Sequence, residues 1–473
     1  MFIPRGLANG QTMALTIHQL LNSGNQSTTR VSRATILLML RKFVKALIPT
    51  QLFQAIEPYG HLAETVLANI RYGFPARGLN VIGVTGTDGK TTTTTLIWKM
   101  LTEAGYNVGY MTTIGYGTPR HQNHNVVHMT TMQAFPMMKR IRELRREGID
   151  WLVLETTSHA LAQNRVWGVP YSVAVMTNVN HEHLDYHRTF ERYRDAKRRL
   201  FQLTGRNTRG LQVGVVNAED PSAQLFASDV PNVYLYGIEK GDVRACNITS
   251  SGGGSQYSVK VEDGSLSVTV NLPGTFNVLN SLAAVCVGFA LKLAPRQIEQ
   301  GIAALTAVEG RMTSIKQGQN FSVIVDFAHT PASFEKLLND MRTKMKEPHR
   351  LVVMFGSAGR RDEAKRATQG QIAGTYADEV VVTEEDDRDI DGELIMDQIA
   401  SGAKKAGKVK DKDLFLVHNR SEAIRFAIGR AKPGDTVMLL GKGHERTIER
   451  ADGEHPWDEV GEARAAIADI SQR

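Results

Sequence analysis

Residues 81–93 run Val-Ile-Gly-Val-Thr-Gly-Thr-Asp-Gly-Lys-Thr-Thr-Thr, and this stretch decides the fold class. A short apolar run with β-branched residues leads into a glycine-rich turn, and a helix is expected from Lys90 to about Gly105. A buried strand that passes through such a turn into a helix is typical of a parallel sheet with crossover helices. Glycines let backbone N–H groups turn inward, and the helix N-terminus adds positive potential. The stretch therefore predicts a phosphate-binding loop.

Within this loop the individual side chains have distinct expected tasks. Lys90 is expected to reach the β- and γ-phosphates, and a hydroxyl of Thr91 or Thr92 to hold Mg²⁺. The general motif also requires a glycine five residues before the second one, where Val84 stands, and a Gly-Lys-Thr tripeptide alone could be a simple helix start. The strand–turn–helix setting favours phosphate binding. The expected ATP-binding loop comprises Gly86, Thr87, Asp88, Gly89, Lys90, Thr91 and Thr92.

Apolar runs alternate with helical segments over the rest of the chain. The predicted strands are 151–154, 172–176, 211–216, 322–325, 351–355, 379–383 and 436–440. Helices are predicted within 277–305 and at 332–343, 363–376, 393–405 and 420–430, and a small antiparallel patch is expected at 242–272. This alternation predicts an α/β protein. We expect a central P-loop-type parallel-sheet ATPase domain (78–309) and a C-terminal Rossmann-like α/β domain (310–473), preceded by a short helical N-terminal segment (1–77).

The N-terminal segment has its own pattern. Ile36, Leu37, Leu40, Phe43, Val44 and Leu47 recur at helical spacing, with basic residues on the other faces. A basic amphipathic helix can lie on a membrane surface or pack on its own protein, and the second alternative is favoured. Helix is expected to continue to about Tyr72. Whether translation starts at Met1, Met13 or Met39 is left open.

Composition excludes several classes of protein. The chain is 42% hydrophobic and 22% charged, which does not fit a disordered protein. Lys and Arg outnumber Asp and Glu by seven, but the surplus is scattered, so nucleic acid is not an expected partner. Cys246 and Cys286 lack metal-ligand spacing and suggest a reducing compartment. With no apolar run of about 18 residues and no signal-peptide pattern, we expect a cytoplasmic protein without a membrane span.

Polar side chains follow two of the predicted strands. Glu155 ends one strand, and His181-Glu182-His183 follows the next, at the edge of the sheet where ligands collect. Glu155 alone would be a solvated acid. Four histidines between 159 and 187 could also suggest zinc, but a phosphate loop upstream favours Mg²⁺ with oxygen ligands.

Together these segments resemble the Mur ligases. The resemblance rests on Gly86–Thr92, on Glu155–His159, on Thr177–Asp185 (with Glu182 where the family has Asp) and on Tyr193–Phe201. It implies an ATP-dependent amide-bond ligase that phosphorylates a carboxylate. Its implied catalytic residues are Lys90, Glu155, His183 and Lys197. It also implies that Thr91, Glu155, His183 and Lys197 hold Mg²⁺, Lys197 as a carbamate formed with CO₂.

Later segments extend the resemblance. Gly274–Asn280, Gly310–Met312 and Asp326–Pro331 imply ATP contacts for Asn277, Arg311, Asp326 and His329, although Asn277 could also be a helix N-cap. Phe355–Asp362 and Gly441–Glu445 resemble the MurE-type ligases, which add a diamino acid to UDP-MurNAc-L-Ala-D-Glu in peptidoglycan synthesis. The expected partners are therefore two small molecules, the muramoyl peptide and the amino acid. The protein is expected to be a monomer.

The resemblance also implies the substrate contacts. They are Thr130, Thr131, Ser158 and Arg165 for the muramoyl peptide, and Asp386, Arg388, Gly441 and Glu445 for the amino acid. Diaminopimelate ligases carry Asp-Asn-Pro-Arg where this chain has Glu385-Asp386-Asp387-Arg388. Arg388 favours meso-diaminopimelate through a bidentate carboxylate contact. Asp386 and Asp387 either recognise an ammonium or pair with Arg388, so L-lysine and ornithine stay open.

Three alternatives remain from the sequence. Residues 1–77 lack the glycine-rich, β-containing pattern of the family's uridine-binding domain, so a nucleotide-free or lipid-linked muropeptide is one alternative, and peripheral membrane contact would suit it. A poly-amino-acid or folate-type ligase is the second, and a non-catalytic nucleotide-binding regulator the third. The base that deprotonates the amine is not identifiable from the sequence.

Overall fold

The computed structural model describes residues 50–125, 129–251, 253–261, 264–345 and 347–471. The chain divides into two compact units, Met1–Glu57 and Pro58–Arg473, and the second contains every described strand. The predicted helix at 36–47 lies outside the described residues. None of the helices in the described part of the chain combines the length and apolar composition needed to cross a bilayer.

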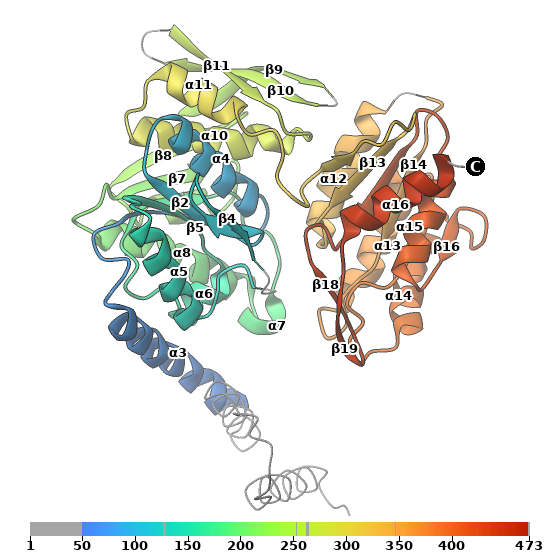
Figure 1. Cartoon of the computed structure of the whole chain (residues 1–473), viewed down its shortest axis with the longest axis horizontal. Coiled ribbons are helices and arrows are strands. Elements are labelled where there is room, and N and C mark those ends of the chain that lie inside the picture. Colours follow the sequence, from blue (N-terminus) through green and yellow to red (C-terminus); the bar gives the residue numbers. More distant parts are fainter. Residues whose placement is uncertain (1–49, 126–128, 252, 262–263, 346, 472–473) are drawn as a thin grey trace, which may run out of the picture. The chain divides into compact units, whose positions relative to one another are not determined.

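An 11-stranded sheet forms the first half of the Pro58–Arg473 unit, in the order β11-β10-β9-β8-β7-β6-β1-β5-β2-β3-β4 (Figure 1). Its strands are β1 (Asn80–Thr85), β2 (Val108–Met111), β3 (Gly115–Gly117), β4 (Gln122–His124), β5 (Trp151–Glu155), β6 (Tyr171–Met176), β7 (Val213–Asn217), β8 (Asn232–Gly237), β9 (Val243–Ser251), β10 (Gly254–Val261) and β11 (Gly264–Val270). β1 pairs in parallel with β5 and β6, so it lies inside the sheet. The predicted antiparallel patch is β9–β11.

Both faces of this sheet are buried at its central parallel strands β1, β5, β6 and β7. The helices of this half are α3 (Thr50–Tyr72), α4 (Lys90–Glu103), α5 (Ala134–Arg146), α6 (Ser158–Ala162), α7 (Leu184–His187), α8 (Phe190–Arg206), α9 (Ala223–Ala227), α10 (Phe276–Ala290) and α11 (Pro295–Ala303). Successive strand residues point to opposite faces. Ile82 and Val84 of β1 accordingly pack with α4 and α10, whereas Val81 packs on the other face with α5 and α8.

A second sheet follows residue 310, with six strands in the order β12-β13-β17-β14-β15-β16. They are β12 (Thr313–Ile315), β13 (Ser322–Asp326), β14 (Leu351–Phe355), β15 (Glu379–Val382), β16 (Leu414–Leu416) and β17 (Thr436–Leu440), and the hairpin β18 (Thr447–Arg450) and β19 (Gly453–Pro456) lies outside it. All pairs within the sheet are parallel except β12 with β13.

Helices cover this sheet on both faces as well (Figure 1). They are α12 (Pro331–Lys344), α13 (Ala364–Tyr376), α14 (Gly392–Lys405), α15 (Arg420–Gly429) and α16 (Glu459–Ser471). Val353 and Phe355 pack in one apolar cluster with residues of α12–α14, and Val352 and Met354 pack in the other with residues of α15 and α16. The α/β prediction is confirmed. The helices predicted within 277–305 are α10 and α11, and Pro295 begins the second of them.

Candidate functional site

The phosphate loop lies between β1 and α4, where its glycines are required. Gly89 has φ +78° and stands at the N-terminal end of α4. A Cβ at Gly89 would lie 2.3 Å from Oδ1 of Asn280, and one at Gly86 would lie 1.8 Å from Oγ1 of Thr177. A side chain at either position would therefore collide with a neighbouring segment, and glycine leaves the backbone N–H groups accessible.

The segment after β6 holds this loop in place. The Thr87 N–H donates to the backbone oxygen of Asn178 at 2.8 Å, and the Asp88 N–H donates to its side-chain oxygen at 2.9 Å. The Thr177 hydroxyl donates to the Asp88 carbonyl at 2.6 Å. The ammonium group of Lys90 donates to the Thr87 carbonyl at 2.7 Å. The loop conformation is thus fixed by β6, as expected for adjacent parallel strands.

Glu155 meets the loop at the first turn of α4. The Thr91 hydroxyl lies 3.1 and 3.0 Å from the two carboxylate oxygens of Glu155, and the Thr113 N–H donates to one of them at 2.9 Å. Glu155 is buried. A hydroxyl and a carboxylate beside a phosphate loop are the hard oxygen ligands that Mg²⁺ prefers.

Lys197 reaches the same loop from α8. Its amine is buried and donates to the Gly86 carbonyl at 2.5 Å. It also lies 4.4 Å from the ring centre of Tyr193. Burial, helped by the nearby charge of Lys90, lowers the pKa of Lys197 well below its usual range. The neutral amine, which is the nucleophilic form, is therefore more populated at a given pH than in an exposed lysine.

His183, Glu182 and His329 form a polar group at the other side of the loop. His183 follows β6 with φ +55°, and burial lowers its pKa. Glu182 lies 3.6 Å from Nε2 of His183 and 3.6 Å from Nε2 of His329. Burial would raise the pKa of Glu182, but the charges of both histidines and the hydrogen bond with His329 hold it below its usual value. His329 is beyond residue 310, so this group joins both halves of the unit.

Among the described side chains, those of the histidine-rich stretch 159–187 do not bring three ligand atoms together for a metal. The His159 ring contacts His183 and His187 at 4.7 and 5.3 Å between ring centres. Burial and the neighbouring histidines lower the pKa of His159 to about 3. Within the described residues, the group whose ligand atoms come together for a metal is instead Glu384, Asp387 and His418.

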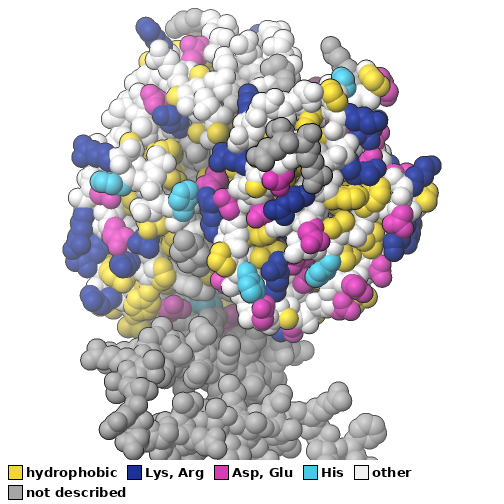
Figure 2. Space-filling view, turned by 45° about the vertical axis from the view of Figure 1, so that its right-hand side comes forward, with side chains coloured by type: hydrophobic (Ala, Val, Ile, Leu, Met, Phe, Trp, Pro, Cys, Tyr) yellow, Lys and Arg dark blue, Asp and Glu magenta, His cyan; other side chains and the backbone are white. Residues whose placement is uncertain are grey.

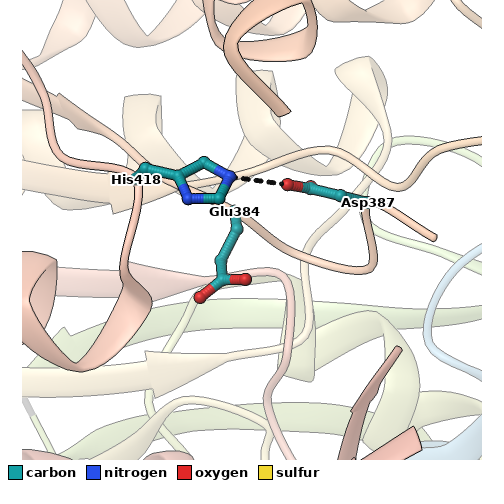
Figure 3. A group of neighbouring side chains, drawn as sticks. All are labelled: Glu384, Asp387 and His418. Atoms are coloured by element: carbon teal, nitrogen blue, oxygen red, sulfur yellow. Dashed lines mark hydrogen bonds and ion pairs between the residues drawn. The ribbon is translucent and has the colours of Figure 1, made fainter. Parts of the chain in front are cut away.

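That group is shown in Figure 3, and its contacts argue against a metal site. The His418 ring faces Asp387 at 3.1 Å, and a carboxylate oxygen of Glu384 lies within 4.8 Å of both. Both oxygens of Glu384 accept hydrogen bonds from Arg450 at 2.8 Å. An arginine that already neutralises the carboxylate leaves it a poor metal ligand.

Arg311 and Asp326 bring the second half of the unit to the loop. The Arg311 guanidinium lies 3.3 Å from the Thr91 hydroxyl and over the Phe327 ring at 4.5 Å. Asp326 accepts backbone N–H bonds from Met312 and Ala328, both at 2.7 Å. Asp326 therefore shapes the backbone beside Arg311.

A cavity of about 340 Å³ connects these groups. Of the predicted residues it is lined by Thr87, Asp88, Gly89, Lys90, Thr91, Thr92, Thr130, Glu155, His183, Asn277, Arg311, Asp326, His329 and Glu445. Gly86, Thr131, Ser158, Arg165, Lys197, Asp386, Arg388 and Gly441 lie outside its lining. Asn277 lies inside α10, whose N-cap is Thr275, so the N-cap interpretation of Asn277 is wrong.

Two of the predicted substrate contacts support the backbone instead of lining the cavity. Arg165 donates to the Thr131 carbonyl at 2.5 Å. The Thr131 hydroxyl donates to the Glu155 carbonyl and accepts from the Thr157 N–H, both at 3.0 Å. Arg165 and Thr131 thus hold the segment that presents Thr130. Ser158 is buried and bonds His187 at 3.0 Å.

Three of the residues predicted to contact the incoming amino acid already form ion pairs within the protein: Asp386, Arg388 and Glu445. Lys442 is fully buried, 2.8 Å from Asp386 and 2.6 Å from Glu445. Arg388 pairs with Glu449 at 2.6 Å, and its separation from Asp386 is 4.0 Å. Asp386 therefore pairs mainly with Lys442 and not with Arg388.

Several cavity residues were not selected from the sequence. Asn178, Glu182, Asn280 and His444 stand inside the quoted segments, so the segments themselves were a signal. Thr113, Lys336, Arg361 and Arg446 also line the cavity. Thr113 and Lys336 carry no pattern of their own, because only the packing of their elements brings them to the loop.

Two family models match the chain: the Mur ligase middle domain over residues 84–288 and the Mur ligase, glutamate ligase domain over residues 310–443. A UDP-N-acetylmuramyl-tripeptide synthetase of Roseiflexus sp. (strain RS-1) is 39% identical over 425 residues, covering 87% of this chain and 83% of the relative. A UDP-N-acetylmuramoyl-L-alanyl-D-glutamate--2,6-diaminopimelate ligase of Geobacillus thermodenitrificans (strain NG80-2) is 36% identical, covering 92% and 88%.

Solved structures share the fold. A UDP-N-acetylmuramoyl-L-alanyl-D-glutamate--2,6-diaminopimelate ligase superposes with a TM-score of 0.59 at 29% identity, covering 88% of this chain and 83% of that chain. A MurF ligase from Thermotoga maritima in complex with ADP superposes with a TM-score of 0.62 at 18% identity, covering 87% and 84%.

Proposed function

Because the chain belongs to the Mur ligase family, we propose that it adds a diamino acid to the D-glutamyl carboxylate of a muramoyl-L-Ala-D-Glu peptide in the cytoplasm. The observation that carries this proposal is the meeting of Thr91, Glu155 and Arg311. At the phosphate loop the Thr91 hydroxyl lies 3.0 Å from a carboxylate oxygen of Glu155 and 3.3 Å from the guanidinium of Arg311, which come from distant parts of the chain. Residues 78–309 would bind ATP and residues 310–473 the incoming amino acid, with 1–77 as a helical N-terminal segment.

The residues present fit ATP and Mg²⁺. Gly86 and Gly89 leave room where a Cβ would intrude, and Thr91 and Glu155 offer oxygen ligands, with the imidazole of His183 across the cavity. Mg²⁺, when bound, neutralises phosphate oxygens and so assists phosphoryl transfer.

The proposed reaction has two steps. A carboxylate oxygen of the muramoyl peptide attacks the γ-phosphorus of ATP, which forms an acyl phosphate and releases ADP. The amine then attacks the acyl carbon, phosphate leaves, and the nitrogen loses a proton. Lys90 and Arg311 lie on the cavity wall, where they would stabilise the negative charge that develops on phosphate and acyl oxygens.

Lys197 is the proposed site of a carbamate. A neutral amine adds to CO₂ and releases one proton, and the product is an anionic oxygen ligand. The lowered pKa of Lys197 and its contact with the Gly86 carbonyl support this assignment. The carbamate would place a negative charge beside the phosphate loop at Gly86.

The incoming amino acid is proposed to be meso-diaminopimelate, with L-lysine as the second candidate. Arg388 offers the guanidinium that a distal carboxylate requires. Glu449 already pairs with it, so a carboxylate would have to share or displace that contact. Asp386 is neutralised by Lys442, which leaves it a weak binder of an ammonium.

Phosphate release tests the proposal. The purified protein is assayed with Mg²⁺, ATP and UDP-N-acetylmuramoyl-L-Ala-D-Glu against a panel that includes meso-diaminopimelate, L-lysine and ornithine. Release that needs both the dipeptide and one diamino acid is expected. If phosphate is released with a nucleotide-free or lipid-linked muropeptide but not with the UDP-linked dipeptide, the carboxylate donor is that muropeptide. If no donor supports phosphate release, the ligase proposal is rejected.

A further inference from the structure

One side of α3 exposes large apolar side chains. Tyr59, Leu67 and Ile70 are 73%, 58% and 61% exposed, and Phe74, just beyond the helix, is 40% exposed. Tyr59, Leu67 and Ile70 follow helical spacing through Ala63, so they lie on one side of the helix. The opposite side of α3 is buried and packs on the half of the protein that contains the 11-stranded sheet. A contiguous apolar stripe of this kind marks an interaction surface.

A basic hollow adjoins the end of this stripe. Arg77, Arg142, Arg145 and Arg146 line it together with Tyr72 and Phe74, and no acidic residue of the described chain is among its lining residues. Arg145 is fixed by a hydrogen bond to the Pro75 carbonyl at 3.2 Å. On the face drawn in Figure 2, acidic and basic side chains are interspersed, so a hollow lined by four arginines differs from the surface there.

The charge of the N-terminal sequence has the same sign. Residues 1–56 contain six basic residues and no Asp or Glu, and they account for six of the seven excess positive charges of the whole chain. The basic residues are Arg5, Arg30, Arg33, Arg41, Lys42 and Lys45. A partner as basic as residues 1–56, or a second copy of this chain, would place positive charge against the arginines of the hollow. Charge complementarity therefore favours an anionic partner.

We propose that the exposed side of α3 and the arginine hollow form a docking surface for an anionic lipid bilayer. Guanidinium groups pair with phosphate oxygens of lipid headgroups. Leu67, Ile70 and Phe74 would enter the boundary between headgroups and acyl chains, as apolar faces of interfacial helices do. The ligase would then bind reversibly to a membrane surface that it does not span. This inference does not depend on the reaction proposed above.

Vesicle co-sedimentation of the full chain tests the proposal. Vesicles of phosphatidylcholine alone are compared with vesicles that also contain phosphatidylglycerol. Binding is expected only to the anionic vesicles, and it should weaken as salt is added. An arginine near an anionic surface changes the partition coefficient about fivefold. Arg142→Glu with Arg146→Glu should therefore weaken binding at least about twentyfold, and Ile70→Glu should weaken it as well.

Matched controls separate this surface from general charge and hydrophobicity. Leu394→Glu changes an exposed leucine of α14 (52% exposed), and Arg209→Glu changes an exposed arginine after α8. Both should bind vesicles as the unaltered protein does, and ATP turnover in solution should persist in all variants and report that they are folded. Equal binding to neutral vesicles, or unchanged binding by Ile70→Glu, would overturn the proposal. Loss of a dimer in the Ile70→Glu variant would assign the surface to a second copy instead.

Discussion

Lys197→Met is the perturbation that tests the buried amine most directly. Methionine keeps a similar length and removes the ammonium, so packing around α8 should be retained. Burial first, and then the charge of Lys90, lowers the pKa of Lys197 in the folded protein. The unfolded chain titrates near 10.4 at this position. Between the two pKa values the folded protein binds fewer protons than the unfolded chain, so the free energy of unfolding of the unaltered protein rises with pH.

The magnitude follows from that difference. Each pH unit in the window adds at most about 1.4 kcal/mol. From pH 9 to 10, where the unfolded lysine is still mostly protonated, the unaltered protein should gain roughly 1.2 kcal/mol relative to Lys197→Met. Urea unfolding of both proteins in CO₂-free, Mg²⁺-free buffer measures it. Groups that titrate equally in both proteins cancel in the comparison.

The same urea-unfolding comparison can contradict the argument that the Lys197 amine is neutral. If the two proteins keep a constant difference in unfolding free energy over this range, Lys197 is protonated in the folded state and the neutral-amine argument is wrong. Lys99→Met on the surface of α4, where Lys99 pairs with Glu103 at 2.6 Å, is the matched control and should show no such slope. With CO₂ and Mg²⁺ restored, Lys197→Met should lose turnover even where its stability is greater.

Two further predictions concern the phosphate loop, and a third concerns a buried ion pair between α15 and α16. Lys90→Ala should abolish turnover with the circular dichroism spectrum unchanged, whereas Lys99→Ala keeps turnover, and equal turnover in both variants would reject the phosphate-loop assignment. Gly89→Ala and Gly105→Ala both place alanine at positive φ and should each lose about 1–2 kcal/mol of stability in urea unfolding. Only Gly89→Ala should lose ATP binding in calorimetry, because its Cβ meets Asn280 whereas that of Gly105 meets no atom within 4 Å. Arg420→Met removes the guanidinium that neutralises fully buried Glu459, which then keeps the hydrogen bond from Trp457. The variant should lose about 3–5 kcal/mol in urea unfolding, and a loss below about 1 kcal/mol would contradict the buried pair.

The secondary structure of the α/β core was predictable because each element carries a local pattern. The predicted strand at 351–355 matches β14, and the predicted helix at 393–405 lies within one residue of α14. Buried parallel strands are continuous apolar runs, so their signal does not depend on neighbours. The short strands β3, β4 and β16, which lie at or next to a sheet edge, have three residues each and were not predicted. Their pairing depends on the strand beside them.

The candidate site was predictable to a different extent. Glycine, lysine and threonine types at fixed spacing indicate a phosphate loop, because a backbone cradle at a helix start requires them locally. Among the partners of the loop, Glu155 was indicated by its position at the end of a predicted strand, whereas Lys197 and Arg311 were named only through the resemblance. The helical spacing of Tyr193, Ala196, Leu200 and Phe201 places Lys197 on the buried face of α8 and leaves its basic neighbours off it. That pattern indicates burial, but it does not indicate that the amine meets the phosphate loop.

By itself the sequence determined the local chemistry of this protein: a strand, a glycine turn and a helix start able to cradle phosphate. Tertiary structure decided which groups meet there. Thr91 meets Glu155 across 64 residues of sequence, Lys197 meets Gly86 across 111, and Arg311 meets Thr91 across 220. The physical reason is that local backbone preference acts over a few residues, whereas contacts at these separations and the pKa values that burial imposes depend on the order of strands in the sheets.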